Sequence, residues 1–194
     1  MMITDLITRT RTFRRFNSQK PVPHDLVTQF IDLARLGGSA RNIQPCKYMI
    51  CSTKDHCSAV FPLLGWAGYL PHWSGPAKEE RPSAYILCLL DTDLCDNADF
   101  DLGIASQNIL LGAMAHGIGG CRIASFSSAL TQLLHLPDNL TLKLVIALGY
   151  PAENVTLVDP SEKGDIKYWH GDGNSHFVPK RRLSEILLPL PLKS

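Results

Sequence analysis

Residues 102–115 read LGIASQNILLGAMA, a run in which apolar residues fall on almost every side of a helix before His116 and Gly117 end it. A helix with so little polar surface is typically buried nearly all round. In a small domain such burial is easiest if part of the helix faces another subunit. A wholly internal core helix explains the pattern equally well, so both interpretations stay open.

Shorter helices are predicted before this run. Thr4 and Asp5 can cap a first helix near the start of the chain. After Pro23, apolar residues recur at helical spacing until the glycine pair at residues 37 and 38 stops the pattern. Each of these helices has one apolar face to pack against the rest of the molecule.

Three apolar runs bounded by turn residues predict strands at residues 47–52, 84–91 and 141–148. A further helix, capped by Ser127 or Ser128, is predicted between the last two strands. Helices and strands intermix without a regular alternation along the chain. The pattern therefore favours an α+β domain over a doubly wound one.

The composition bounds the size and the partners of the molecule. The chain has 194 residues and a formal net charge of +1, so residues 1–194 are expected to form a single domain with its own core. Dedicated nucleic-acid-binding and membrane-surface proteins usually carry a strong basic excess. No apolar run is long enough to span a bilayer. We therefore expect a cytoplasmic protein with no nucleic-acid partner, no membrane partner and at most a small anionic ligand.

Metal and nucleophile motifs are weak in this sequence. The six cysteines form no Cys-x-x-Cys pair, and several lie in apolar runs where Cys behaves as a small hydrophobe. The acidic stretch at residues 91–101 lacks the pattern of a calcium loop, and His170 and His176 flank what is interpreted as a surface turn. No metal site is expected. Neither a Gly-x-Ser-x-Gly nor a Gly-x-Gly-x-x-Gly motif occurs, so acyl transfer and a dedicated nicotinamide-binding fold have no support.

Basic residues gather in two clusters near opposite ends of the chain. Arg and Lys form their strongest hydrogen bonds with phosphate oxygens, and chain termini often lie close together. The clusters therefore predict one clamp for a small phosphate, with two separate solvated patches as the alternative. Their members are Arg9, Arg11, Arg14 and Arg15 in the first cluster, and Lys180, Arg181 and Arg182 in the second.

Two polar segments could serve the same ligand. Residues 11–16, Arg-Thr-Phe-Arg-Arg-Phe, offer guanidinium groups and a hydroxyl where a helix ends. Residues 39–45, Ser-Ala-Arg-Asn-Ile-Gln-Pro, form a loop of small and amide side chains between a helix stop and a strand. Such a loop could approach a planar ligand closely, and an ordinary polar turn is the alternative.

In their order along the chain, these segments resemble the signatures of the FMN-dependent nitroreductase family. Arg-Thr-x-Arg-x-Phe and Ser-x-x-Asn-x-Gln-Pro are similar to its two N-terminal signatures, and further matches follow at residues 101–121, 148–151 and 178–182. The resemblance covers nearly the whole chain. It implies an α+β fold with a mixed, mainly antiparallel sheet sandwiched by helices, and a homodimer with two FMN molecules at the subunit interface.

The resemblance assigns roles to residues from both basic clusters. Arg11 and Thr12 would contact the flavin phosphate and ribityl chain. Arg14 would lie near the pyrimidine edge of the ring, where its charge supports the reduced flavin. Lys180 and Arg182 would complete the phosphate site.

Other flavin contacts are implied at the polar loop and after the central helix. Ser39 and Asn42, with Gln44 supporting the loop, would reach the flavin from the partner subunit. Backbone N–H groups near the reactive nitrogen of the ring would come from Ile123, Ala124 and Ser125.

The sequence departs from the family pattern in three places. Thr12 stands where serine is more frequent, which keeps the hydroxyl, and Cys46 replaces a frequent tryptophan. The segment at residues 66–81 is shorter than the helical insertion that many relatives have over the substrate pocket. Its candidates for a substrate wall are Trp66, Tyr69 and Trp73, with core or lid packing as the alternative.

The resemblance also implies the reaction. NADH or NADPH would donate hydride and leave, and a nitroaromatic, quinone or similar small-molecule acceptor would follow in the same pocket, which is a ping-pong mechanism. The flavin would carry the chemistry, so no side chain is assigned a catalytic role beyond the electrostatic support from Arg14. Two alternatives stay open: a specialised flavin enzyme acting on one metabolite, and a non-catalytic module that binds a phosphate ligand or nucleic acid.

Overall fold

Four antiparallel strands form the central sheet of the computed structural model, which describes residues 2–70, 72–160 and 164–191. Their order in the sheet is β1-β2-β4-β3. The central strand β2 is buried along seven of its eight residues because both faces of the sheet are covered, which explains its unbroken apolar sequence. The strands are β1 (Cys46–Cys51), β2 (Ala84–Asp91), β3 (Gly119–Ile123) and β4 (Leu140–Gly149).

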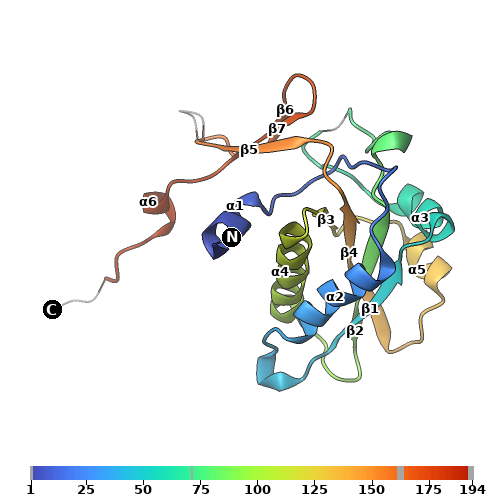
Figure 1. Ribbon diagram of the computed structural model, residues 1–194. Helices are drawn as coiled ribbons and strands as arrows, with labels where there is room; N and C mark the ends of the chain where they lie inside the picture. The colour runs from blue at the N-terminus through green and yellow to red at the C-terminus, as the bar shows by residue number, and fades with distance from the viewer. Residues whose placement is uncertain (1, 71, 161–163, 192–194) are drawn as a thin grey trace.

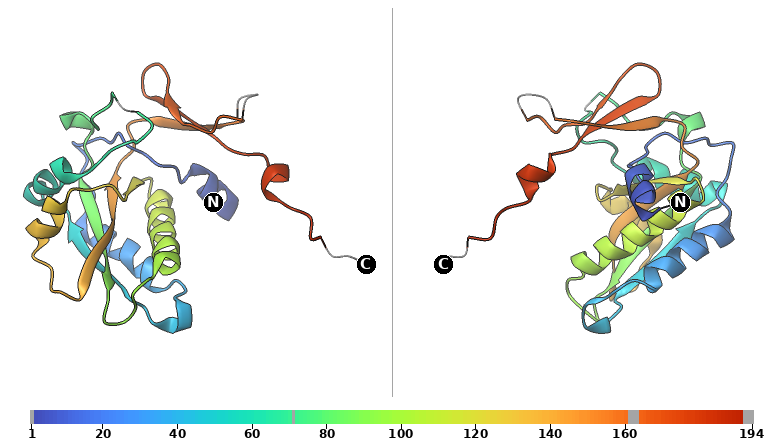
Figure 2. Two further views of the ribbon diagram at one scale, coloured as in Figure 1. Left: turned by 180° about the vertical axis from the view of Figure 1, so that it is seen from behind. Right: turned by 60° about the vertical axis from the view of Figure 1, so that its left-hand side comes forward.

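Helices cover both faces of this sheet (Figures 1 and 2). On one face, α2 (His24–Arg35) and α4 (Asp99–Ala115) pack against alternate strand residues that include Ile86. On the other face, α3 (Lys54–Val60) and α5 (Ser128–Leu134) pack against the residues between them, which include Leu87. The expected α+β sandwich is therefore confirmed, and the three predicted strands lie within one or two residues of the observed ones.

A second, smaller sheet lies at one end of the molecule. It contains β5 (Asn154–Val158), β7 (Ser175–Pro179) and β6 (Trp169–His170), in the order β5-β7-β6. β5 pairs with β7 in parallel and β6 pairs with β7 antiparallel, so the two sheets together are mixed and mainly antiparallel. Short 3₁₀ helices at Ala40–Asn42, Phe61–Leu63 and Lys78–Glu80 complete the connections.

The helix starts agree in part with the predicted caps. α1 (Ile3–Arg9) begins after Met2, whose N–H donates to Asp5 Oδ2 at 3.3 Å, so Asp5 caps the helix as predicted and Thr4 does not. Thr4 lies inside the first turn instead. Ser127 caps α5, because its Oγ accepts the N–H of Ala129 at 3.2 Å.

One face of α4 is open in the single chain. Ala105 and Ile109 are buried against the core, but Phe100 is 89% exposed and Ile104 is 44% exposed. The single chain therefore does not bury α4 on all sides, as a wholly internal helix would require, because Phe100 and Ile104 keep exposed apolar surface.

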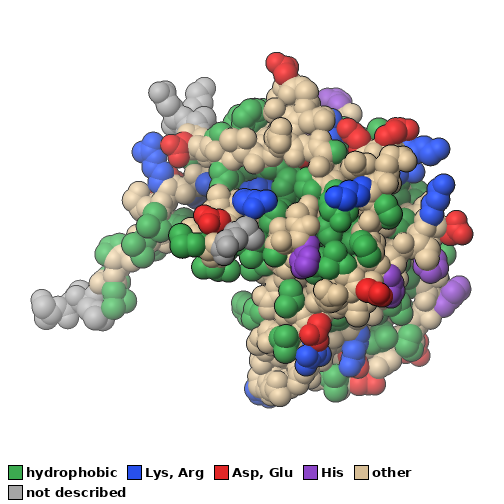
Figure 3. Space-filling view, in the orientation of Figure 1, with side chains coloured by type: hydrophobic (Ala, Val, Ile, Leu, Met, Phe, Trp, Pro, Cys, Tyr) green, Lys and Arg blue, Asp and Glu red, His purple; other side chains and the backbone are tan. Residues whose placement is uncertain are grey.

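An extended arm follows β7 and stands off from the body of the molecule (Figure 2). It carries α6 (Leu183–Ile186), and its apolar side chains are well exposed (Figure 3). Leu183 is 69% exposed and Leu188 is 78% exposed. Among the described residues, none of the helices has the length and apolar character needed to cross a bilayer.

Candidate functional site

Residues from both ends of the chain line one cavity of about 290 Å³. Arg11, Thr12 and Arg14 come from the segment after α1, and Lys180 comes directly after β7. The predicted meeting of the two basic clusters is therefore observed. Further lining residues that sequence reasoning did not single out are Thr10, Gln107, Leu110, Arg122, Tyr168, His176 and Val178.

Buried guanidinium nitrogens in this cavity have no hydrogen-bond partner within the described part of the chain. They are Nε of Arg11 and Nη1 of Arg14. Arg11 Nη2 donates to the carbonyl of Ile7 at 2.6 Å, and the Arg14 guanidinium lies 4.5 Å from the ring centre of Tyr168. Burial lowers the pKa of Arg11 from its ordinary value. Buried charged donors are normally paired, so these atoms indicate an anionic ligand.

The charge of the cavity supports the same interpretation. Its lining includes the cationic side chains of Arg11, Arg14, Arg122 and Lys180, and no carboxylate. Guanidinium and ammonium groups that converge on one concave site favour phosphate or carboxylate oxygens.

A glycine pair allows residues 11–15, called the arginine segment below, to lie against the central sheet. The N–H of Phe13 donates to the carbonyl of Gly120 at 3.0 Å. A Cβ atom on Gly119 would lie 2.5 Å from the Phe13 ring, so the close approach requires glycine there. The glycine turn after α4 therefore holds the arginine segment in place.

Glu153 fixes the same segment from the other side, and sequence reasoning missed this residue. Its Oε1 accepts the N–H of Arg14 and, at 3.0 Å, the N–H of Arg15. Its Oε2 lies 3.6 Å from Nδ1 of His176. Burial alone would raise the pKa of Glu153, but His176 and the two backbone N–H groups outweigh it and hold that pKa below its ordinary value.

His176 is buried, which corrects its interpretation as the flank of a surface turn. It lies in β7, 1% exposed, and its partner across the strands is His170 in β6. Ligand-type atoms of Glu153, His170 and His176 all lie within 4.8 Å of one another. Because Glu153 already accepts two backbone N–H groups, we interpret this cluster as the contact that links the arginine segment to β7. The absence of a metal site stays a prediction.

Arg122 reaches the cavity from β3 and is held by the central helix. Its Nε donates to Ser106 Oγ at 2.8 Å, and its Nη2 donates to Gln107 Oε1 at 2.8 Å. The guanidinium is thereby oriented by α4. Its place directly after the glycine turn was the only sequence signal that could have identified it.

The loop with Ser39, Asn42 and Gln44 lies away from this cavity. Ser39 Oγ donates to Asp101 Oδ2 at 2.5 Å and accepts the N–H of Gln44 at 2.8 Å. Asp101 lies in the first turn of α4, whereas Leu110 of the same helix lines the cavity. These two positions are about 13 Å apart along the helix at about 1.5 Å per residue. Ser39 and Gln44 instead line a separate cavity of about 440 Å³.

The geometry of that loop is unusual. Arg41, Asn42 and Gln44 all have a positive φ, between 51° and 57°. Side chains other than glycine rarely adopt this conformation, and it is concentrated at functional sites. The loop is therefore held in a defined shape by Asp101 rather than forming an ordinary turn.

The stretch Ile123, Ala124 and Ser125 ends β3 and does not line the cavity. Ile123 is buried, while the other two residues are exposed. The N–H of Gly65 donates to the carbonyl of Ser125 at 2.8 Å, which ties this stretch to the segment before Trp66.

The three aromatic candidates for the substrate wall separate into two groups. Tyr69 packs on Tyr168, which lines the cavity, with a ring separation of 5.1 Å. Trp73 packs edge-on to His170, which does not line the cavity, at 5.4 Å. Trp66 instead packs on Phe61, with a ring separation of 5.8 Å. This contact is consistent with the core or lid packing that was the alternative for Trp66.

Arg182 lies outside the cavity in the single chain. It precedes α6, and its N–H donates to Glu185 Oε1 at 3.2 Å. Its predicted phosphate contact and the roles of the other candidate residues stay predictions.

The sequence resembles several curated proteins over most of its length. A protein of Methanothermobacter thermautotrophicus, provisionally named NADH dehydrogenase/NAD(P)H nitroreductase, is 28% identical over 79% of this chain and 80% of its own. The 4-nitrobenzoate reductase of Pseudomonas putida is 26% identical over 79% of this chain and 87% of its own. No protein-family model matches the sequence.

Solved structures share the fold. A provisionally named nitroreductase of Desulfovibrio desulfuricans in complex with FMN aligns with a TM-score of 0.69 at 22% identity, over 100% of this chain and 99% of its own. A nitroreductase family protein of Streptococcus pneumoniae aligns with a TM-score of 0.66 at 20% identity, over 82% of this chain and 94% of its own. At these identities the structural likeness supports the fold alone.

Proposed function

Because the chain belongs to the nitroreductase family, we propose that it is an FMN-dependent oxidoreductase that uses NAD(P)H to reduce a nitroaromatic, a quinone or a similar acceptor by a ping-pong mechanism. The observation that carries this proposal is the cavity in which Arg11, Arg14 and Lys180 meet without a carboxylate partner. A small, uncompensated cationic site beside α4 suits one phosphate monoester with an attached planar group.

The described residues fit FMN. The unpartnered guanidinium nitrogens of Arg11 and Arg14 are donors that phosphate and ring oxygens accept. When bound, FMN supplies two-electron chemistry through its ring. The side chains of Arg11, Thr12 and Lys180 would hold the phosphate and the ribityl hydroxyls. Arg14, fixed by Glu153, would hold positive charge near the ring, where reduction adds negative charge.

The reaction balances with one NAD(P)H for each two-electron step. One hydride from NAD(P)H and one proton from water convert a nitro group into a nitroso group and a water molecule, or a quinone into a hydroquinone. Donor and acceptor would occupy the same site in turn beside Tyr69, which packs on the cavity-lining Tyr168, with Trp73 farther out against His170.

We also propose that the functional molecule is a homodimer. The cavity of about 290 Å³ is at the small end of the range for cofactor sites, so a second chain would be needed to complete it. The open stripe with Phe100 and Ile104 and the exposed leucines of the arm give apolar surface for that contact. The partner's loop would then supply the side chains equivalent to Ser39 and Asn42.

Purified protein is expected to be yellow, with a released cofactor that migrates as FMN and not as FAD. The loaded protein should oxidise NADH or NADPH when 4-nitrobenzoate or benzoquinone is added, because the donor needs an acceptor to turn over. Absorption spectra, chromatography of the heat-released cofactor and the loss of NAD(P)H absorbance measure the three results. A protein that takes up no FMN on reconstitution contradicts the proposal. Bound FMN without turnover would leave a binding module as the correct function.

An Ile104→Glu substitution is expected to weaken the dimer by about 2 kcal/mol or more, because a charge would enter the centre of the proposed interface. This is about 30-fold in the dissociation constant. Leu133→Glu on α5 is the matched control, since Leu133 is 46% exposed on the other face of the sheet. Light scattering across a dilution series measures the mass. A wild-type monomer, or equal effects of the two variants, would be incompatible with an α4 interface.

A further inference from the structure

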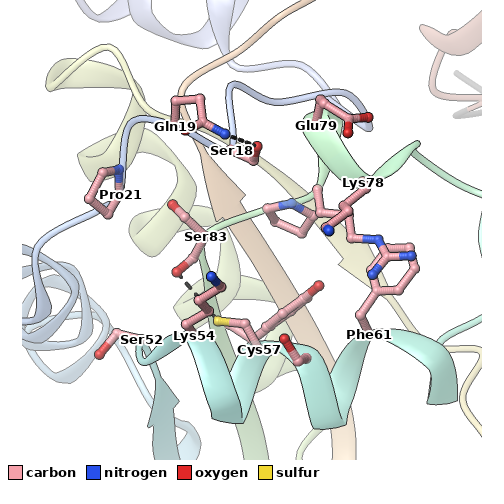
Figure 4. A pocket seen from close by; sticks show the side chains of 14 residues that line it. Ser18, Gln19, Pro21, Ser52, Lys54, Cys57, Phe61, Lys78, Glu79 and Ser83 are labelled. Carbon is pink, nitrogen blue, oxygen red and sulfur yellow. Dashed lines mark hydrogen bonds between the residues drawn. The ribbon is translucent and has the colours of Figure 1, made fainter.

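A cavity of about 610 Å³, called the second cavity below, is larger than the two already described and is built from other parts of the chain. It lies between the segment after Ser18, the helix α3 and the residues that lead into β2 (Figure 4). None of its lining residues lines the cavity with Arg11, Arg14 and Lys180, called the arginine cavity below. Nothing in the proposed flavin chemistry uses this space.

The floor of this second cavity contains a buried hydroxyl that lacks a partner. Tyr85 is fully buried, lines the cavity, and its hydroxyl forms no hydrogen bond within the described residues. Arg81 also lines the cavity, and its Nε is likewise buried and unpartnered. Buried polar groups are almost always paired, so two such groups at one cavity indicate that a ligand supplies the missing acceptors.

The charge of this cavity is positive. Lys54, Lys78 and Arg81 line it against a single carboxylate, that of Glu79. No acidic side chain within the described ranges forms an ion pair with any of these three cations. Arg81 is also fixed in place, because its guanidinium lies 3.9 Å from the ring centre of Phe61. A positioned guanidinium that shares one cavity with two ammonium groups favours an oxyanion.

The remaining wall is apolar and unreactive. Phe61, Pro21 and Pro82 contribute apolar surface that suits the body of an organic molecule. The Cys57 thiol donates to the carbonyl of Ser83 at 3.4 Å, and burial raises its pKa to about 11. Cys57 therefore stays a neutral thiol and provides no nucleophile. The cavity is suited to binding rather than to catalysis.

We propose that this cavity is a second binding site, for a small molecule that joins one carboxylate or phosphate group to an apolar body. The acid group would accept hydrogen bonds from Arg81 and the Tyr85 hydroxyl, with Lys54 and Lys78 at the rim. The apolar body would lie against Phe61 and the two prolines. The site does not depend on bound flavin, since it shares no residue with the arginine cavity.

Calorimetric titration of the full chain, saturated with FMN, tests the site with two probes that share a phenyl ring and differ in their acid group. Benzoate carries a carboxylate and phenyl phosphate carries a phosphate, so the tighter probe identifies the preferred acid. Benzyl alcohol lacks the charge and should not bind. The flavin absorption spectrum is recorded in parallel, because a probe that stacks on the flavin changes that spectrum and one in the second cavity does not.

Two variants locate the binding without disturbing the flavin site. Tyr85→Phe removes only the hydroxyl and should weaken the bound acid about fivefold. The exposed pair Lys54→Gln and Lys78→Gln, made together, should also weaken it about fivefold. Lys167→Gln is the control, since Lys167 is exposed and lines neither cavity.

The outcomes decide the proposal. Binding that leaves the flavin spectrum unchanged and is weakened in both variants but not in the control supports the second site. Absence of binding for both acids up to about 10 mM, the weakest range of specific affinity, overturns it. Equal affinities in the wild type and both variants, or binding detected only through the flavin spectrum, overturn it as well. These results are independent of whether the protein reduces an acceptor.

Discussion

Replacing Glu153 with alanine is expected to lower the free energy of unfolding by about 2–6 kcal/mol, because each of two backbone donors left without an acceptor costs about 1–3 kcal/mol. Glu153 is 6% exposed and accepts the backbone N–H groups of Arg14 and Arg15. Its loss leaves both donors without their acceptor and removes the carboxylate that lies 3.6 Å from His176 Nδ1. The same variant should lose FMN, because the arginine segment is no longer fixed. Urea unfolding and flavin titration measure the two effects.

The pH dependence of stability separates the charge of Glu153 from its shape. Its pKa in the folded state lies below its ordinary value of 4.5, so the carboxylate stabilises the fold above about pH 4.5. This contribution is lost as the pH falls through the lowered pKa. Glu153→Gln keeps the shape without the charge, so its deficit against the wild type should shrink on acidification below about pH 4.5. A deficit that stays constant between pH 7 and pH 3.5 would contradict the assigned role.

Arg11→Ala and Lys180→Ala are each expected to weaken FMN binding by at least about tenfold, because a charge-assisted hydrogen bond contributes about 1.5–3 kcal/mol. The two side chains lie on one cavity but come from opposite ends of the chain. If they hold one phosphate, the double variant should lose less than the product of the single effects, since the first deletion already lets the anion shift. Quenching of flavin fluorescence measures all three affinities.

Two further variants serve as references for that titration. Arg182→Ala should have a smaller effect than Arg11→Ala, because Arg182 lies outside the cavity in the single chain. Arg35→Ala should have no effect, since its guanidinium pairs with Asp32 on the exposed face of α2. If both Arg11→Ala and Lys180→Ala bind FMN with the affinity of the wild type, the flavin does not bind in this cavity.

Much of the fold could be predicted because its signals are local. β2 was predicted with its observed bounds, since it is a run of apolar residues between turn residues. The helix over residues 24–35 was also expected, because its apolar residues recur at helical spacing and a glycine pair follows. Periodicity and capping act within a few residues, so a single sequence carries them fully.

The contacts of Glu153 with the arginine segment and with His176 could not be predicted from the sequence. Glu153 lies 139 residues from Arg14, and no local pattern indicates that a carboxylate will accept that N–H group. His176 was assigned to a surface turn because glycines and Asp172 surround it. Its burial results from the parallel pairing of β5 with β7, which depends on contacts far apart in the sequence. Only the family resemblance implies that Ser39 lies away from the cavity of its own chain, because it assigns Ser39 to the flavin of the partner subunit.

The lining of one cavity by residues far apart in the sequence also has a consequence for the timing of synthesis. Arg11 and Arg14 precede the central sheet in the chain, but Lys180 and His176 follow all of it. Ribosomes add about 5–20 residues per second, so Arg11 precedes Lys180 by roughly 8 to 34 s. During that interval the central sheet can form while the cavity lacks one wall. Capture of the cofactor is therefore expected to follow the formation of the central sheet in each molecule.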